Sequence, residues 1–113
     1  MTNVNEKDWK LFRQKLPIWQ ESYIEKQIEG YKTLLESCEN ASEKFWKLDE
    51  RIKQDKRSPG VLLKDVRRSD MDIVLLQLLM NKVISRKDLE GFSNELCERL
   101  DRFMENFEIN SAD

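Results

Sequence analysis

The chain has 113 residues, of which 39% are hydrophobic and 37% charged, and its net charge is −2. This length is too short for two independent cores, and the apolar content is too high for a disordered chain. Few glycines and prolines, with abundant Glu, Lys and Leu, favour helices over strands. We therefore expect an all-α fold, a compact bundle of four to five helices. It forms one domain over residues 1–113, with 6–107 ordered and 1–4 and 109–113 frayed.

Apolar residues recur at steps of three and four from Trp9 to Leu35. This spacing is typical of an amphipathic helix, and we expect one over residues 6–37. Asn5 is a suitable N-cap. Pro17 lacks the backbone donor that a helix interior needs, so we expect a kink or a break there.

A second helix is predicted from Asn40, because Asn40 and Glu43 have the spacing of a capping box. It is expected to end near Arg57, before the helix-breaking sequence Ser58-Pro59-Gly60. The apolar residues that follow predict a short third helix at 61–66.

The segment 71–82 is apolar on nearly every side, which predicts the central helix or a subunit interface. Ser69 and Asp72 resemble a capping box that opens this helix. An aspartate in place of Leu76 is therefore expected to unfold the domain.

The last helix is expected to begin at the capping pattern of Ser85 and Asp88 and to bend at 91–93. Its apolar face predicts contacts with the central helix and with the first one. The core positions expected from these faces are Trp19, Ile28, Leu35, Leu96, Leu100 and Phe103.

The sequence offers little chemistry for catalysis. It has no histidine, no phosphate-binding glycine motif, and two cysteines, Cys38 and Cys97, outside any metal-binding spacing. Glu21, Glu25 and Glu29 share a helix face, which is either a metal-binding ridge or, as we favour, a solvated surface. We expect no enzyme activity, no catalytic residues, no cofactor and no metal site.

Residues 51–68 hold seven basic and two acidic side chains, in contrast to the acidic flanks. One interpretation is a nucleic-acid-binding helical domain, with a helix-turn-helix-like segment at 75–96. The acidic residues Asp88, Glu90 and Glu95 and a pI near 5.3 argue against it. We favour a charged helix end and an exposed loop, which an acidic protein partner or a second copy of the chain can also use.

Phe45 and Trp46 are adjacent, so a helix points their rings about 100° apart and exposes at least one of them. Exposed aromatic residues between charges are typical anchors of protein interfaces. The leading hypothesis is a non-enzymatic protein-interaction module, a small cytosolic regulator or adaptor that binds a protein partner or forms a homodimer. The candidate partner-binding residues are Phe45, Trp46, Arg57, Lys64, Arg67 and Arg68.

The longest apolar run, 71–80, is half the length of a membrane span, and the first ten residues hold no secretory signal. We expect no membrane partner and a cytoplasmic location. The strings FRQKLPIWQ, EKFWKLDERIKQDKRSPGVLL and DLEGFSNEL resemble a family of short bacterial all-helical proteins, some labelled "multidrug transporter". The missing membrane span conflicts with that label. Locally, LLMNKVISRKDLEGF is similar to the SHOCT-type helical hairpins of oligomerising bacterial proteins. Neither resemblance implies a functional residue.

Overall fold

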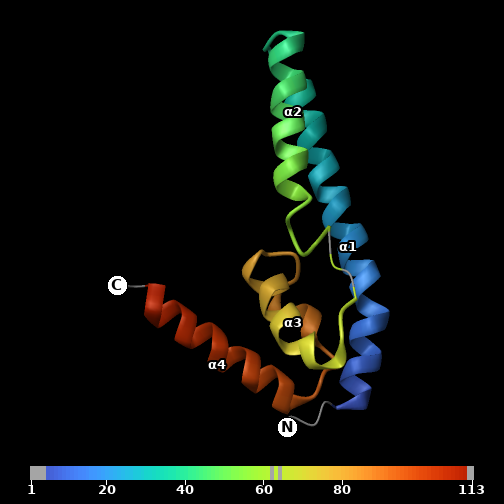
Figure 1. Cartoon of the computed structure of the whole chain (residues 1–113), viewed down its shortest axis with the longest axis vertical. Coiled ribbons are helices and arrows are strands. Elements are labelled where there is room, and N and C mark those ends of the chain that lie inside the picture. The colour runs from blue at the N-terminus through green and yellow to red at the C-terminus, as the bar shows by residue number, and fades with distance from the viewer. Residues whose placement is uncertain (1–4, 62, 64, 112–113) are drawn as a thin grey trace.

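The computed structural model describes residues 5–61, 63 and 65–111, with side chains to Asn106. The fold is all-α and forms a single unit, which confirms the predicted fold class. The described residues form four α-helices and two 3₁₀ helices, and none of them is in a strand (Figure 1). In chain order the elements are α1 (Glu6–Leu35), α2 (Ala41–Asp55), η1 (Arg68–Asp70), α3 (Met71–Met80), η2 (Arg86–Leu89) and α4 (Asn94–Ser111).

Helix α1 starts where the sequence predicts. The side chain of Asn5 accepts hydrogen bonds from the backbone N–H groups of Lys7 (2.9 Å) and Asp8 (3.3 Å). The helix then continues through Pro17, so the expected break is absent. Phe12 and Trp19 are buried on either side of Pro17 in the same core, and this packing offsets the one helical bond that proline removes.

Helix α2 begins as predicted, with the Asn40 side chain accepting from the backbone N–H of Glu43 at 2.9 Å. The expected helix at 61–66 does not form. Within this segment the structure describes Val61, Leu63, Asp65 and Val66, and none of them is helical. Asp65 has a φ of 55°, a left-handed conformation that a right-handed helix cannot contain. Leu62 and Lys64 lie outside the described residues.

The capping pattern expected at Ser69 and Asp72 is wrong by two positions. Asp70 accepts from the backbone N–H of Arg67 at 3.0 Å and so closes the 3₁₀ helix η1 ahead of α3. Asp72 instead forms an ion pair with Arg99 of α4. The local spacing identified a helix start but could not tell which carboxylate closes it.

The last helix also begins later than expected. The carboxylate of Asp88 accepts from the backbone N–H of Ser85 at 2.7 Å, but this pattern opens only the 3₁₀ helix η2. Gly91 then has a φ of 97°, which ends that turn. Ser93 starts α4, because its Oγ accepts from the backbone N–H of Leu96 at 3.3 Å. The predicted bend at 91–93 is therefore a complete break.

Helix α3 is the most buried helix, as predicted, but it is covered on one side only. Its fully or nearly fully buried side chains are Met71, Val74, Leu75 and Leu78. Their spacing of three and four residues defines one stripe that packs on α1 and α4. Ile73 on the opposite side is 51% exposed, and Leu76 is only partly buried. Within the chain the helix is therefore not covered all round and Leu76 is not fully buried, whereas the subunit-interface alternative stays a prediction.

Half of the predicted core residues are in the core. Trp19, Leu96 and Leu100 are buried, and the Trp19 ring stacks on that of Phe92 with centroids 6.3 Å apart. The other three, Ile28, Leu35 and Phe103, are each close to half exposed. The outer part of α1 and the end of α4 extend away from the core (Figure 1), so apolar positions there are not buried in it.

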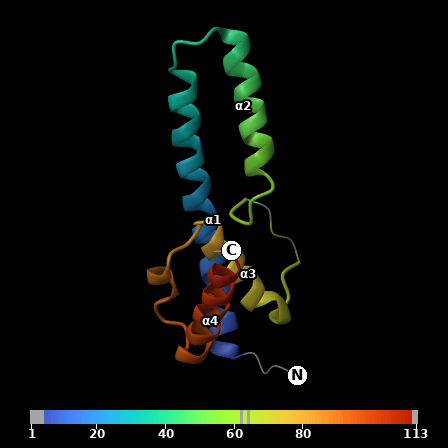
Figure 2. The same cartoon turned by 90° about the vertical axis from the view of Figure 1, so that its left-hand side faces the viewer.

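The molecule is elongated, with extents of 55 × 37 × 23 Å. Its radius of gyration is 17.0 Å, whereas a spherical domain of this length has about 13 Å. The second half of α1 and the whole of α2 form an antiparallel pair that projects beyond α3 and α4 (Figure 2). We call residues 20–59 the arm, and the remaining described residues the body.

Gly60 marks the joint between the arm and the body. It is buried, and a Cβ atom added there would lie 2.5 Å from Cδ2 of Tyr23 and 2.9 Å from Cγ2 of Val83. Only a glycine lets the chain pass this closely between α1 and the segment after α3. The side chain of Gln20 also donates to the carbonyl of Pro59 at 3.2 Å, which fixes the base of the arm.

Candidate functional site: the two-helix arm

The arm has no core of its own. None of its forty residues is buried, although every one of them is described. The buried apolar side chains all belong to the body. Burial of apolar area is the main stabilising contribution to a fold, so the outer part of the arm gains little from the rest of the chain.

A polar cluster joins the two helices of the arm. The Tyr31 hydroxyl donates to the carboxylate of Asp55, and the Arg51 guanidinium lies 5.3 Å from the centre of the Tyr31 ring. Arg51 also donates to the carbonyl of Gly30 at 3.3 Å. Burial, reinforced by the Asp55 carboxylate, raises the pKa of Tyr31 to about 12. The phenol therefore stays protonated at neutral pH and acts as a hydrogen-bond donor.

Phe45 and Trp46 lie near the outer end of the arm, one turn into α2. Their ring centroids are 5.0 Å apart at an interplanar angle of 89°, an edge-to-face pair. Phe45 is 63% exposed and Trp46 65% exposed, so both rings face solvent, which agrees with the expectation that at least one of them is exposed. An exposed, mutually ordered aromatic pair has the chemistry of an interface anchor.

The structure does not gather the predicted basic residues into one surface. Arg57 lies just beyond α2, at the base of the arm, and Arg67 adjoins η1 in the body; both are exposed. Arg68 is bound to the start of α1: its Nε lies 3.1 Å from Glu6 Oε1, and its guanidinium lies 5.8 Å from the Trp9 ring. The proposed role of Lys64 falls outside the described residues.

The segment 75–96 does not fold as two helices joined by a tight turn. Between α3 and α4 lie thirteen residues that include η2 and two left-handed positions, Lys82 (φ 59°) and Gly91. A recognition helix would have to include residues 86–96, and only the first turn of α4 falls in that range. The helix-turn-helix expectation is therefore wrong in its geometry.

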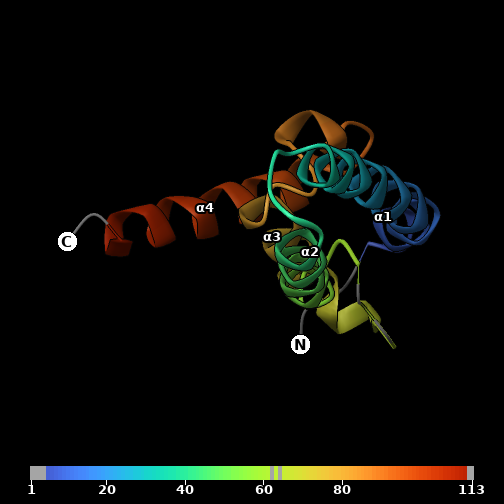
Figure 3. The same ribbon diagram turned by 90° about the horizontal axis from the view of Figure 1, so that it is seen from above.

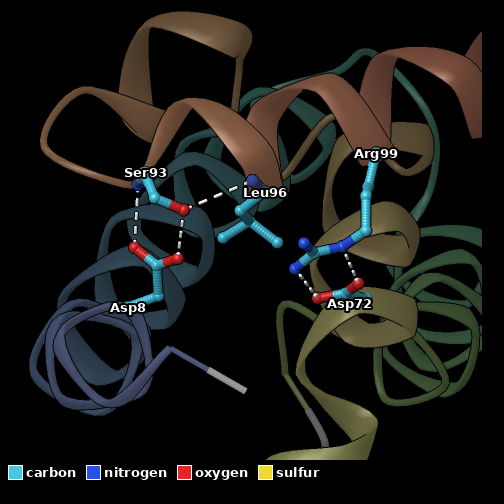
Figure 4. Close-up of polar contacts among 5 residues, drawn as sticks. All are labelled: Asp8, Asp72, Ser93, Leu96 and Arg99. Atoms are coloured by element: carbon cyan, nitrogen blue, oxygen red, sulfur yellow. Dashed lines mark hydrogen bonds and ion pairs between the residues drawn. The ribbon is translucent and has the colours of Figure 1, made fainter. Parts of the chain in front are cut away.

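The polar contacts of the body hold α4 in place, and sequence reasoning missed them. Asp8 is 2% exposed and is the sole buried charged side chain among the described residues. Its carboxylate accepts from the backbone N–H of Ser93 (2.8 Å) and from the Ser93 hydroxyl (2.5 Å) (Figure 4). The Ser93 hydroxyl also caps α4, so the Asp8–Ser93 pair links the start of α1 to the start of α4.

Nearly two turns further along α4, Arg99 forms a two-point ion pair with Asp72 of α3, with Nε–Oδ2 at 2.8 Å and Nη2–Oδ1 at 3.3 Å (Figure 4). The hydrogen bond to Asp72 raises the pKa of Arg99 above its ordinary value. Both side chains are partly buried, and each hydrogen-bonds the other at two points. Together with the Asp8–Ser93 pair, this arrangement fixes α4 on the body.

A cleft of about 520 Å³ lies between α1, the segment after α3 and α4. Its walls include the apolar side chains of Leu79, Val83 and Met104 and the exposed ion pair of Arg86 with Asp101, whose Nε–Oδ1 distance is 3.1 Å. The cleft is open and has mixed charge. In the described part of the chain no three His, Cys, Asp or Glu side chains are placed to hold a metal ion.

Both cysteines are free thiols, Cys97 buried in the core and Cys38 exposed at the turn of the arm. Within the described ranges, no helix combines the length and the apolar character that crossing a membrane requires.

These features define an all-α protein with a packed body and a projecting two-helix arm. No protein-family model, curated protein or solved structure matches the chain.

Proposed function

We propose that the protein is a non-enzymatic protein-interaction module, a small regulator or adaptor that binds its partner through the arm. The observation that carries this proposal is the contrast within one chain. The body buries a continuous core, whereas the arm has no buried side chain.

The arm also carries half of the large hydrophobic side chains that are exposed among the described residues. These are Ile28, Leu35, Phe45 and Trp46. Apolar groups gathered on a projecting element lose contact with water only when another molecule covers them. The aromatic pair supplies the large, stiff side chains that dominate binding energy at protein interfaces.

The position of the arm favours binding over a purely structural role. It projects from the body along the long axis (Figure 1), and in the view from above α4 extends to one side, away from both of its helices (Figure 3). A partner can therefore reach the two helices of the arm without meeting the end of α4. The polar cluster of Tyr31, Arg51 and Asp55 keeps the two helices paired while their apolar side chains remain free for a partner.

A photo-cross-linking experiment tests the proposal. The photoreactive amino acid p-benzoylphenylalanine replaces Trp46 in one variant and Phe103 in a matched control, since Phe103 is a half-exposed aromatic residue of the body. Irradiation in the producing cell is expected to give protein adducts of defined mass from position 46 and few from position 103. Equal yields of protein adducts at the two positions would contradict the proposal. Adducts that are digested by nuclease and not by protease would also contradict it.

A further inference from the structure

Six apolar side chains of the arm share one face, three of them exposed and three partly buried. On α1, Ile24, Ile28 and Leu35 follow one stripe that also contains Tyr31. On α2, Phe45, Leu48 and Ile52 follow one stripe that also contains Asp55. The Tyr31–Asp55 hydrogen bond places these two stripes next to each other. The six apolar side chains therefore line one continuous side of the arm, which we call the arm face.

Charged side chains border the arm face in a specific order. From the base of the arm to its tip, the border on α1 carries Glu21, Glu25 and Lys32, each three or four residues from Ile28 or its stripe. The border on α2, read in the same direction, carries Lys56, Lys53 and Asp49. The first order is acidic, acidic, basic, and the second is basic, basic, acidic.

The charges on the two borders also lie at matching positions along the length of the arm. The contacts of Gln20 with Pro59 and of Arg51 with Gly30 set the antiparallel register of the two helices. In this register Glu25 is level with Lys56 and Lys53, and Lys32 is level with Asp49. The ion pairs that Lys53 and Lys32 form with Asp49 and Glu29 within the chain are exposed, so they stabilise little and can exchange.

We infer that the arm face docks on the arm face of a second copy of this chain. A two-fold axis parallel to the arms sets α1 of one copy beside α2 of the other. On each border Glu25 of one copy then meets Lys53 and Lys56 of the other. Lys32 meets Asp49, and the apolar stripes form the centre of a four-helix bundle. This inference rests on the proposed function and names its partner. The sequence predicted a possible subunit interface at the apolar helix 71–82, whereas this inference places the homodimer contact on the arm.

Sedimentation equilibrium measures the association. The wild-type chain is expected to show twice its mass of 13.6 kDa at micromolar concentration. Phe45→Glu places a charge on the outer end of the arm face and is expected to raise the dissociation constant on the order of 100-fold. Phe103→Glu makes the same change on the body and is expected to leave the mass unchanged. Circular dichroism verifies that both variants fold.

Mixing two charge variants tests the alignment. One variant carries Glu21→Lys with Glu25→Lys, and the other carries Lys53→Glu with Lys56→Glu. Each alone brings like charges together across the interface and is expected to be monomeric. An equal mixture restores opposite charges on both borders and is expected to form a heterodimer.

The outcomes separate this inference from the proposed function. A wild-type chain that remains at 13.6 kDa overturns the second copy as partner; adducts from position 46 to a different protein would then still support the arm as a binding site. If Phe103→Glu dissociates the dimer and Phe45→Glu does not, the arm is not the interface. Variants that stay apart when mixed overturn the parallel alignment.

Discussion

Replacing Leu78 by alanine is expected to lower the free energy of unfolding by about 3 kcal/mol. The Leu78 side chain has no exposed surface, and it belongs to the buried stripe through which α3 packs on α1 and α4. The alanine removes three carbon atoms from this packing and leaves a cavity that rigid helices do not fill, which typically costs about 2 to 5 kcal/mol. Urea unfolding followed by circular dichroism measures the loss.

Ile73→Ala on the same helix is the matched control. Ile73 is half exposed on the opposite side of α3, so the same kind of truncation is expected to cost less than about 1 kcal/mol. Equal losses at the two positions would show that α3 is covered on both sides. Leu76 is only partly buried, so Leu76→Asp places the carboxylate at the edge of the core. It is therefore expected to lower the free energy of unfolding without unfolding the domain, contrary to the expectation from the sequence.

Replacing Asp8 by alanine is expected to lower the free energy of unfolding by about 2 to 3 kcal/mol. The substitution removes both acceptors of Ser93 and leaves its backbone N–H without a partner in a shielded position. Asp8→Asn keeps one carbonyl oxygen as an acceptor and is expected to lose less. Thermal or urea unfolding of the variants provides the measurement.

Glu6→Ala is the control for Asp8→Ala. Both carboxylates lie in the first turn of α1, so both changes remove a favourable interaction with the helix dipole. Glu6, however, forms only an exposed ion pair with Arg68, whose loss is expected to cost less than about 1 kcal/mol. If Asp8→Ala were as mild as Glu6→Ala, the link between α1 and α4 would not contribute to stability.

The sequence predicted the features that local chemistry determines. Helix periodicity and the caps at Asn5 and Asn40 gave α1 and α2 with nearly correct bounds. The high apolar content of 71–80 identified the most buried helix. The adjacency of Phe45 and Trp46 predicted an exposed aromatic ring near the start of α2. Each of these depends on residues no more than a few positions apart.

The features that the sequence did not predict depend on distant contacts. Asp8 and Ser93 are 85 positions apart, and the only local signal at Asp8 was an acidic residue in a first helical turn. Pro17 leaves α1 unbroken because the core holds both halves of the helix. Ile28 and Leu35 have the spacing of core residues, but periodicity shows which face is apolar and not whether another element reaches it. Apolar positions that no other element of the chain buries therefore make up part of the arm face.

The most direct test of the arm as an interaction element is amide hydrogen exchange, measured by mass spectrometry over about a hundredfold range of protein concentration. At the lowest concentration the amides of residues 20–59 are expected to exchange much faster than those of α3, because the arm has no buried side chain. Raising the concentration is expected to slow exchange in the arm and to leave α3 unchanged. An arm as protected as α3 at every concentration would contradict the account, because such an arm would be stable without a partner.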